Sequence, residues 1–523
     1  MSLRPENHLD GISLLAAFCL ALAAPFARAE GPQPIIVEAE SGKRTGVDIG
    51  KQGQGFTGTG YVTGFDADGD ALELSAQAPA PGIYDLSIRY RCAFGQKGFD
   101  LRVNGIGSSG ILPATGEQFA LHRVGRVELA AGSNTIVVAK GWGFYDVDRV
   151  ELTPSRARGA PQPPPVQAVN PRADDASRDL LARLASGYGR TTLYGLYSEA
   201  DANYLLEHTG RRPAIMGTDL MDASPSRVER GARCEAVRQA IEAHRRGQIV
   251  TVSWHWNAPT DLLDGQMVEH EGKRVEAKWW SGFYTFATSF DLAAALADPA
   301  GERHRLIIRD IDAIAKELAE LRDAGVPVLW RPLHEAEGGW FWWGAKGPAP
   351  FKKLWRLLYE RLAVHHGLDN LLWVYSSGTD PAWYPGDDVV DIVGIDAYPA
   401  DIRDSLDATW ETLLEQYGSR KLLALTEFGG TPDMPRMHDF GVWWSFAVSW
   451  SDREGPRKND VARLKQIIAD GAVGTLPPPL SRRPVAPSRS LLLCAYRASG
   501  AANERGSDHA FGGGPLSVRG SSS

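Results

Sequence analysis

Two glutamates stand where an apolar run of residues ends, a position that suits acid–base and nucleophilic chemistry. Glu335 follows the run Val328–Leu333, and Glu427 follows the run Leu422–Thr426. Two carboxyl groups about 5–5.5 Å apart can cleave a glycosidic bond between them, one as proton donor and one as nucleophile. We therefore take Glu335 and Glu427 as candidates for such a pair of catalytic carboxyl groups.

Aromatic residues follow the first glutamate after a Gly-Gly turn. Trp340, Phe341, Trp342 and Trp343 are consecutive. Aromatic faces bury the apolar faces of sugar rings, so these side chains are candidates for the lining of a sugar cleft. A single glutamate at a strand end is more often a solvated loop residue or an ion-pair partner. Two such glutamates beside an aromatic cluster favour catalysis.

Three further residues at the ends of apolar runs are candidates for substrate contact. His255 can hydrogen-bond a sugar hydroxyl, although a lone histidine is more often structural. Tyr398 can orient the nucleophile through its hydroxyl. The alternative is that its ring packs against neighbouring side chains while its hydroxyl group contacts solvent. Trp450 can form a platform beneath the reacting sugar, with burial in the core as the alternative.

Three motifs lack the context that their chemistry needs. Residues 53–58 match G-x-G-x-x-G, but no helix signal follows, which excludes a dinucleotide site. The aspartates of 66–70 resemble a calcium loop, but position twelve is Gln77. His334 does not begin a zinc-protease motif, because Gly338 occupies the place of the second histidine.

The elements that position these residues alternate between strand and helix patterns from 171 to 475. Helical patterns cover His304–Ala324 and Pro350–His365. Eight β/α units in about 300 residues predict a (β/α)8 TIM barrel, with a doubly wound sheet as the alternative. The active site of such a barrel lies at the carboxyl ends of its strands, so both glutamates are expected at one mouth. The predicted strands are Thr192–Gly195, Ala214–Gly217, Ile249–Trp254, Val328–Leu333, Leu371–Tyr375, Ile392–Ile395, Leu422–Thr426 and Ser445–Trp450.

A chain of 523 residues is too long for one core, and its composition changes along its length. Residues 30–154 carry short β-rich runs between Gly, Asn and Pro turns, which predicts an all-β sandwich. Residues 155–170 are rich in proline and are expected to be a semi-rigid linker that few tertiary contacts cross. Residues 476–523 are rich in Pro, Arg, Ser and Gly and are predicted to be a disordered tail, or an out-of-frame reading of the gene.

The first 29 residues resemble an export signal. Arg4 precedes the apolar run Ile12–Ala24, and Ala27–Ala29 is a small-x-small cleavage site. The alternative is a buried first helix. The run is too short to anchor the chain in a bilayer. We therefore expect a secreted protein, extracellular or periplasmic.

The bulk composition excludes some partners. The net charge of −8 argues against nucleic acid, because phosphate binding needs a basic face. Sixteen tryptophans in an acidic chain favour a neutral ligand that is recognised by stacking on aromatic side chains. We predict neither a nucleic-acid nor a membrane partner, and the oligomeric state stays open. The cysteines have no paired or metal-ligand spacing, so no disulfide framework is expected.

The segments Arg331–Glu335 and Gly338–Gly344, with Thr426–Gly429, resemble glycoside hydrolase family 26. That family consists mainly of endo-β-1,4-mannanases on a (β/α)8 barrel, and the likeness covers about 191–475. Glu337 stands where many members have Asn, and the family's closing segment is missing after Val473. The resemblance implies Glu335 as acid/base and Glu427 as nucleophile. It implies that the residues around the −1 subsite are His255, His334, Trp340, Tyr398 and Trp450.

The segments Val37–Glu40, Gly55–Val62 and Gly141–Asp148 resemble carbohydrate-binding module family 35. The resemblance implies that Glu38, Glu40 and Asp148 hold a structural calcium ion through hard oxygen ligands. It implies Trp142 as a sugar-stacking residue. The alternative is a β-sandwich whose acidic pair is merely solvated.

Together these features predict a secreted retaining endo-β-1,4-mannanase that hydrolyses mannan or galactomannan by double displacement, without a catalytic cofactor. A β-1,3-1,4-glucanase or a β-1,3-xylanase on the same barrel is one alternative. A non-catalytic polysaccharide-binding protein is another. The choice between endo and exo action stays open at this point.

Overall fold

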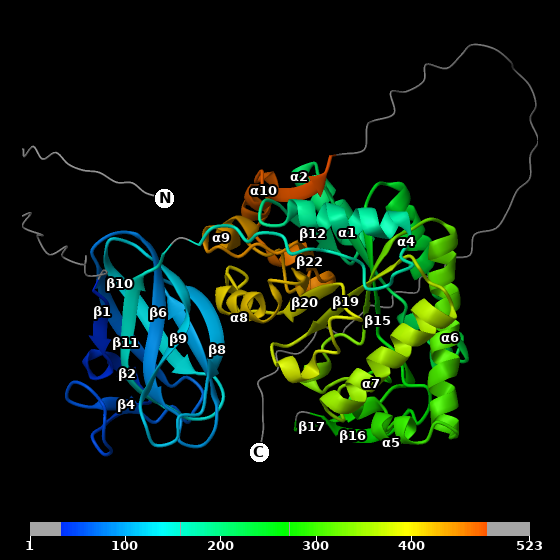
Figure 1. Ribbon diagram of the computed structural model, residues 1–523. Helices are drawn as coiled ribbons and strands as arrows, with labels where there is room; N and C mark the ends of the chain where they lie inside the picture. The colour runs from blue at the N-terminus through cyan, green and yellow to red at the C-terminus, as the bar shows by residue number, and fades with distance from the viewer. Residues whose placement is uncertain (1–32, 157, 271, 478–523) are drawn as a thin grey trace, which may run out of the picture.

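The computed structural model describes residues 33–156, 158–270 and 272–477, which form an all-β module followed by a barrel (Figure 1). The predicted export signal over 1–29 and nearly all of the predicted tail over 476–523 lie outside the described residues. Both therefore stay predictions. None of the described helices is long and apolar enough to cross a membrane.

The N-terminal module is a sandwich of two sheets, as the sequence predicts. One sheet has the order β3-β4-β11-β6-β9, with β1 on β11, and the other has the order β2-β5-β10-β7-β8. Every second residue of β5 is buried, so one face of this strand packs on the opposite sheet. The strands are β1 (Ile35–Glu38), β2 (Lys43–Thr45), β3 (Asp48–Gly50), β4 (Tyr61–Thr63), β5 (Ala71–Ala78), β6 (Gly82–Arg91), β7 (Lys97–Val103), β8 (Ile106–Leu112), β9 (Ala120–Leu129), β10 (Gly132–Lys140) and β11 (Asp146–Pro154).

The second domain is a closed barrel of parallel strands. The last barrel strand pairs with the first, which confirms the (β/α)8 fold and excludes the doubly wound sheet. Each of the eight predicted runs overlaps one barrel strand. These are β12 (Thr192–Leu196), β14 (Ile215–Asp219), β15 (Ile249–Trp254), β18 (Val328–Pro332), β19 (Leu371–Ser377), β20 (Ile392–Ala397), β21 (Leu422–Phe428) and β22 (Phe446–Ser449). The remaining short strands are β13 (Arg212–Pro213), β16 (Met267–His270), β17 (Lys273–Glu276) and β23 (Val473–Leu476).

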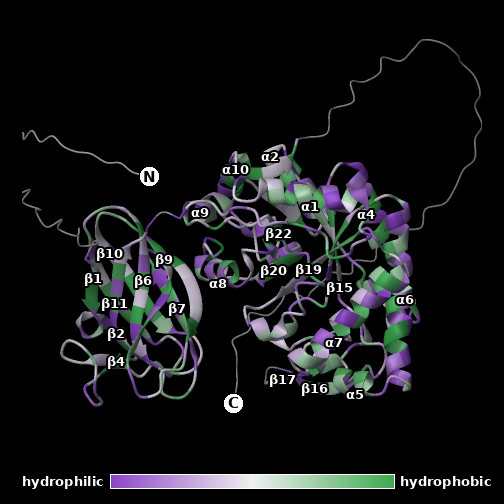
Figure 2. Ribbon diagram, in the orientation of Figure 1, coloured by the Kyte–Doolittle hydropathy of each residue, from purple (hydrophilic) through white to green (hydrophobic). Residues whose placement is uncertain are grey.

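Helices surround the strands, and the two predicted helical stretches are present. Along α6, Ile307, Ile311, Ile314, Leu318 and Leu321 are buried at helical spacing, and polar residues occupy its other face (Figure 2). Helix α7 begins with Pro348 at its first turn and continues as a π-helical segment over Glu360–His365. The α-helices of the described residues are α1 (Asp175–Gly187), α2 (Glu199–Thr209), α3 (Pro225–Val228), α4 (Ala236–Arg245), α5 (Leu292–Ala297), α6 (Glu302–Asp323), α7 (Pro348–Tyr359), α8 (Asp407–Tyr417), α9 (Met434–Asp439) and α10 (Val461–Ala469).

The proline-rich linker lies against the barrel instead of spanning solvent. The backbone N–H of Val169 donates to Asp391 Oδ1 (2.7 Å), and the Tyr359 hydroxyl donates to the Val169 carbonyl oxygen (3.0 Å). The module also contacts the barrel directly, because Arg123 forms an ion pair with Glu411 of α8 (2.5 Å). The prediction that few tertiary contacts cross this junction is therefore wrong.

Candidate active site

Both candidate carboxylates lie at the mouth of the barrel, where the carboxyl ends of the strands meet. Glu335 follows β18, and Glu427 is the penultimate residue of β21. One oxygen each of Glu335, Asp396 and Glu427 lies within 4.8 Å of the other two. The barrel thus brings together two carboxylates that are 92 residues apart in the sequence, with a third acidic group beside them.

The turn that presents Glu335 has an unusual backbone. Leu333 (φ 51°) and Glu335 (φ 54°) both adopt the left-handed conformation, which costs residues other than glycine about 1–2 kcal/mol each. The Glu335 N–H donates to the Ser376 carbonyl oxygen (3.0 Å), and Trp340 Nε1 donates to Glu335 Oε2 (3.0 Å). These bonds hold the carboxyl group in place. Strain of this kind is concentrated at functional sites.

Glu427 receives hydrogen bonds on both carboxylate oxygens. A buried guanidinium group, that of Arg331, contacts Oε1, and the Tyr398 hydroxyl donates to Oε2 (2.8 Å). Donors and a positive charge favour the ionised form of a carboxyl group. The environment of Glu427 is therefore that of a carboxylate anion held in a fixed orientation.

The two glutamates differ in how readily they ionise. Burial, and then repulsion by the Glu427 charge, raise the pKa of Glu335 well above its usual range. Burial also raises the pKa of Glu427, to about 7, but the Arg331 guanidinium opposes this rise. The Arg331 charge and the Tyr398 hydrogen bond favour Glu427 as the ionised member of the pair. The negative charge on Glu427 then favours the protonated, acidic form of Glu335.

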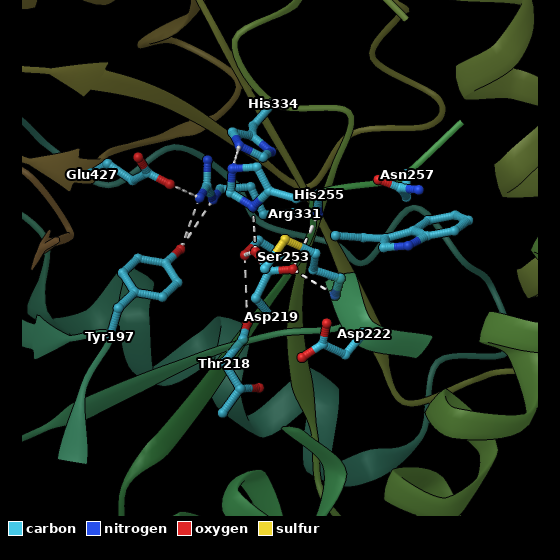
Figure 3. Close-up of polar contacts among 12 residues, drawn as sticks. Tyr197, Thr218, Asp219, Asp222, Ser253, His255, Asn257, Arg331, His334 and Glu427 are labelled. Atoms are coloured by element: carbon cyan, nitrogen blue, oxygen red, sulfur yellow. Dashed lines mark hydrogen bonds and ion pairs between the residues drawn. The ribbon is translucent and has the colours of Figure 1, made fainter. Parts of the chain in front are cut away.

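Arg331 is the positive charge at the centre of the site (Figure 3). It is fully buried, donates to Asp396 Oδ2 (2.9 Å) and Tyr197 Oη (2.9 Å), and contacts Glu427. A buried guanidinium between two carboxylates compensates charges that would otherwise be costly to desolvate. Arg331 lies in the segment 331–335 that carries the family resemblance, but the sequence pattern alone indicates no role for it. A basic residue inside an apolar strand was the available signal.

A chain of hydrogen bonds links the two predicted histidines to an aspartate (Figure 3). His255 Nδ1 is bonded to Asp219, and His255 Nε2 lies 3.1 Å from His334 Nε2. Burial, and then Arg331, lower the pKa of His334 well below its usual range, so this ring is neutral. Asp219 is not among the residues predicted from the sequence, because the predicted strand ends at Gly217, two residues before the end of β14.

Of the four aromatics after the Gly-Gly turn, one lines the site. Trp340 is half-buried, but Phe341, Trp342 and Trp343 are buried in the core. The expectation that all of these tryptophans line a sugar cleft is therefore wrong. Trp343 instead supports the catalytic turn, since its Nε1 donates to the His334 carbonyl oxygen (2.9 Å).

Trp450 directly follows β22 at the mouth of the barrel and is half-buried. Its ring centroid lies 4.9 Å from that of Tyr197 and 6.0 Å from that of His255. The barrel thus places Trp450 beside His255, which is in turn bonded to His334. The site brings together all the predicted barrel residues, and the roles assigned to them stay predictions.

Glu337 joins two loops of the barrel mouth. Its backbone N–H donates to Ser377 Oγ (3.0 Å), and its Oε2 accepts a hydrogen bond from the Asp380 N–H (3.2 Å). The loop after β18, which carries Glu335, is thereby tied to the loop after β19.

Trp142 belongs to the module and does not join the barrel site. It follows β10, and its indole lies over Gly98, where a Cβ atom would be 2.3 Å from the ring. Phe94 and Phe144 are exposed nearby and contact each other at a centroid distance of 5.8 Å. The predicted stacking residue is therefore close in sequence to Phe144, one member of an exposed aromatic pair.

Among the described residues, the three predicted calcium ligands do not form a set of oxygens that all lie within 4.8 Å of one another. Glu38 Oε2 and Asp148 Oδ2 both contact the Thr57 hydroxyl. Asp148 is buried and forms an ion pair with Arg89, which already compensates its charge. Glu40 Oε2 is buried without a hydrogen-bond partner, as a cation ligand would be. The Glu38–Glu40 pair thus fits a calcium ion better than Asp148 does, and calcium binding stays a prediction.

Comparisons with known proteins cover both domains. Residues 169–475 match the model of glycosyl hydrolase family 26, and residues 35–155 match that of carbohydrate binding module family 35. The chain is 44% identical over 442 residues to a mannan endo-1,4-beta-mannosidase of Thermothelomyces thermophilus, covering 84% of this chain and 89% of that protein. It is 33% identical to mannan endo-1,4-beta-mannosidase A of Piromyces sp, covering 80% and 68% respectively.

Solved structures agree with the sequence relatives. The crystal structure of a Podospora anserina GH26-CBM35 beta-(1,4)-mannanase has a TM-score of 0.60 and 44% identity, covering 85% of this chain and 98% of that one. A beta-mannanase from a symbiotic protist of the termite Reticulitermes speratus, complexed with gluco-manno-oligosaccharide, has a TM-score of 0.52 and 28% identity, covering 60% and 98%. The first of these likenesses extends over both the module and the barrel.

Proposed function

This chain belongs to glycosyl hydrolase family 26, with a family 35 carbohydrate-binding module before its barrel, and we propose that it is a retaining endo-β-1,4-mannanase acting on mannan or galactomannan. Its relatives from Thermothelomyces and Piromyces carry that activity in their names. The observation that carries the proposed mechanism is the contrast between a carboxyl group with a raised pKa, Glu335, and a neighbouring carboxylate held by Arg331 and Tyr398.

In the first chemical step, Glu335 gives its proton to the glycosidic oxygen while Glu427 attacks the anomeric carbon. The bond between that carbon and the leaving oxygen breaks, and a covalent glycosyl-enzyme forms. Arg331 and Tyr398 orient the attacking carboxylate. Trp340 fixes the acid through the hydrogen bond to Glu335 Oε2.

In the second step, Glu335 acts as the base. It takes a proton from a water molecule, the resulting hydroxyl adds to the anomeric carbon, and Glu427 leaves as a carboxylate. The anomeric configuration is retained, and both glutamates return to their starting protonation states. No catalytic cofactor takes part in this proposal.

The remaining predicted residues surround the sugar in the −1 subsite. His255 and His334 lie beside the sugar in this proposal, with both ring nitrogens of His255 engaged by Asp219 and His334. The buried Nδ1 of His334, which has no hydrogen-bond partner, is the ring nitrogen left for a sugar hydroxyl. Trp450, beside Tyr197, provides the flat apolar surface beneath the sugar.

The proposal extends to the module and to localisation. The module binds polysaccharide through Trp142 and holds calcium at Glu38 and Glu40. The chain is exported by the signal over residues 1–29. Each of these statements depends on the resemblances and on the residues named, and each is separate from the catalytic proposal.

The direct test is sugar release from a panel of polysaccharides. Mannan and galactomannan should yield reducing sugar as oligosaccharides of mixed length, which is the pattern of endo action. Lichenan and β-1,3-xylan should yield little. Greater release from either of these would favour the glucanase or xylanase alternative. Binding of mannan with no release would favour a non-catalytic polysaccharide-binding protein.

A further inference from the structure

The N-terminal module docks on the segment 401–411 of the barrel domain (Figure 1). This segment consists of the end of the loop between strand β20 and helix α8, together with the beginning of α8. At one end of this segment the backbone N–H of Gly107, in β8, donates to Asp401 Oδ2 (3.0 Å). The Arg403 guanidinium donates in the opposite direction, to the carbonyl oxygen of Gly105 (2.8 Å). The turn before β8 and this barrel segment are therefore bonded reciprocally.

At the other end of the segment, strand β9 of the module contacts helix α8. The backbone N–H of Arg126 donates to Asp407 Oδ2 (2.8 Å), and both residues are buried. Arg123 and Arg126 each form an ion pair with Glu411 at 2.5 Å. Buried and bidentate pairs of this kind fix geometry more strongly than exposed ones do.

The docked segment begins three residues after Tyr398, the residue that donates to Glu427. Ile402 in the docked segment lies beside Gly430 in the loop after β21, because a Cβ atom on this glycine would lie 3.0 Å from Ile402 Cγ2. The docked segment thus contacts the module on one side and, through Ile402, the loop that follows the strand of the nucleophile.

We propose that the module is a positioning element of the active site, in which docking of β8 and β9 on the segment 401–411 holds Tyr398 against Glu427. The module then contributes to turnover of small soluble substrates, to which polysaccharide capture by the module contributes nothing. This inference depends on the proposed hydrolase function with Glu427 as nucleophile.

The inference has a consequence for pH dependence. Loss of the Tyr398 hydrogen bond removes a donor that favours the ionised form of Glu427, so the pKa of Glu427 rises. Activity that requires ionised Glu427 is then lost at a higher pH on the acidic side. The charged and titratable groups of the described residues that face Glu427 are Arg331 from β18, Asp396 from β20, Tyr398 after β20, Glu335 after β18, His255 after β15, Tyr197 after β12 and Tyr284 in the segment before α5. Of these, Tyr398 is the group next to the docked segment.

The test uses the full chain with substitutions on the barrel side of the interface and an aryl β-mannobioside as substrate. Asp401→Ala and Glu411→Ala should each lower kcat about tenfold with little change in KM. Each should also move the acidic limb of the pH profile upward, as Tyr398→Phe should. Asp401→Asn keeps an acceptor oxygen for Gly107 and should restore most of the loss. Adding Glu411→Ala to Tyr398→Phe should cost less than the product of the two single effects.

A matched control is Glu242→Ala, which removes an exposed ion pair with Arg238 on α4 and should leave kcat and the pH profile unchanged. Interface variants that lose thermal stability but keep the wild-type kcat and acidic limb would overturn the inference. Multiplicative effects in the double variant would overturn it too. A wild-type chain that cleaves neither the mannobioside nor mannan would instead contradict the proposed function, and the inference with it.

Discussion

At the scale of single residues, the site depends on unequal environments for two identical side chains. Glu335 is buried beside a negative charge, whereas Glu427 contacts the guanidinium of Arg331 and the hydroxyl of Tyr398. The sequence predicted both glutamates because each stands at the end of an apolar run, and it offered Tyr398 as the residue that orients Glu427. It did not predict the contact with Arg331, because Arg331 is 96 residues away and adjacency follows only from barrel closure.

The unequal environments predict a bell-shaped pH profile. Activity should fall as the pH drops through the pKa of Glu427, which is raised to about 7, because protonated Glu427 cannot attack. Activity should fall again at higher pH as Glu335, whose pKa is raised well above its usual range, loses its proton. In Glu335→Ala the alkaline limb should disappear for activated aryl mannosides, which need no acid. The measurement is kcat/KM against pH for both proteins.

Azide gives the control for Glu335→Ala. A small external nucleophile needs no general base, so azide should restore turnover of aryl mannosides by the variant. Mannan, whose leaving group is poor, should show the larger loss. Equal losses on both substrates, without rescue, would show that Glu335 positions substrate and does not act as acid/base.

At the scale of elements, the hydrophobic pattern located all eight barrel strands, but strand ends were less certain. The run Ala214–Gly217 became β14, which continues to Asp219, and the two added residues include the partner of His255. Polar residues at the carboxyl end of a barrel strand interrupt the apolar pattern because they belong to the site. The apolar pattern therefore predicts strands that are too short at the end that carries the functional residues.

A prediction at this scale concerns the connection between two loops through Glu337. Glu337→Ala removes the acceptor for the Asp380 N–H and should cost about 1 kcal/mol of stability. It should also lower kcat, because the loop that carries Glu335 is loosened. Glu337→Gln keeps an acceptor oxygen and should behave nearly as wild type. Melting temperature and kcat on an aryl mannoside give the comparison, and equal effects of both substitutions would count against this role.

At the scale of the whole molecule, composition indicated two domains but gave no sign that they are docked. The contact between Arg123 and Glu411 joins residues 288 positions apart, and neither stands in a recognisable motif. A proline-rich segment normally indicates a spacer, yet here Val169 and its neighbours bond to the barrel. Interfaces between domains depend on surface complementarity, which one sequence does not display.

A prediction at this scale concerns calcium in the module. An ion that binds the folded module but not the unfolded chain raises the melting temperature, and chelation with EDTA should lower it. Glu40→Gln should abolish this difference, because it removes the charge beside the unpartnered Oε2. Asp148→Asn serves as the comparison, since its charge is compensated by Arg89. A melting temperature that does not respond to calcium in the wild-type protein would contradict the proposed site.

The central claim is that Glu427 is the nucleophile of a retaining mannanase, and covalent trapping tests it most directly. The protein is incubated with a 2-deoxy-2-fluoro mannosyl donor with a good leaving group, then digested and analysed by mass spectrometry. We predict one added fluoromannosyl group, on the peptide that contains Glu427, and none in a folded Glu427→Ala variant. A label on Asp396 or Glu335, or turnover that inverts the anomeric configuration without any label, would contradict the account.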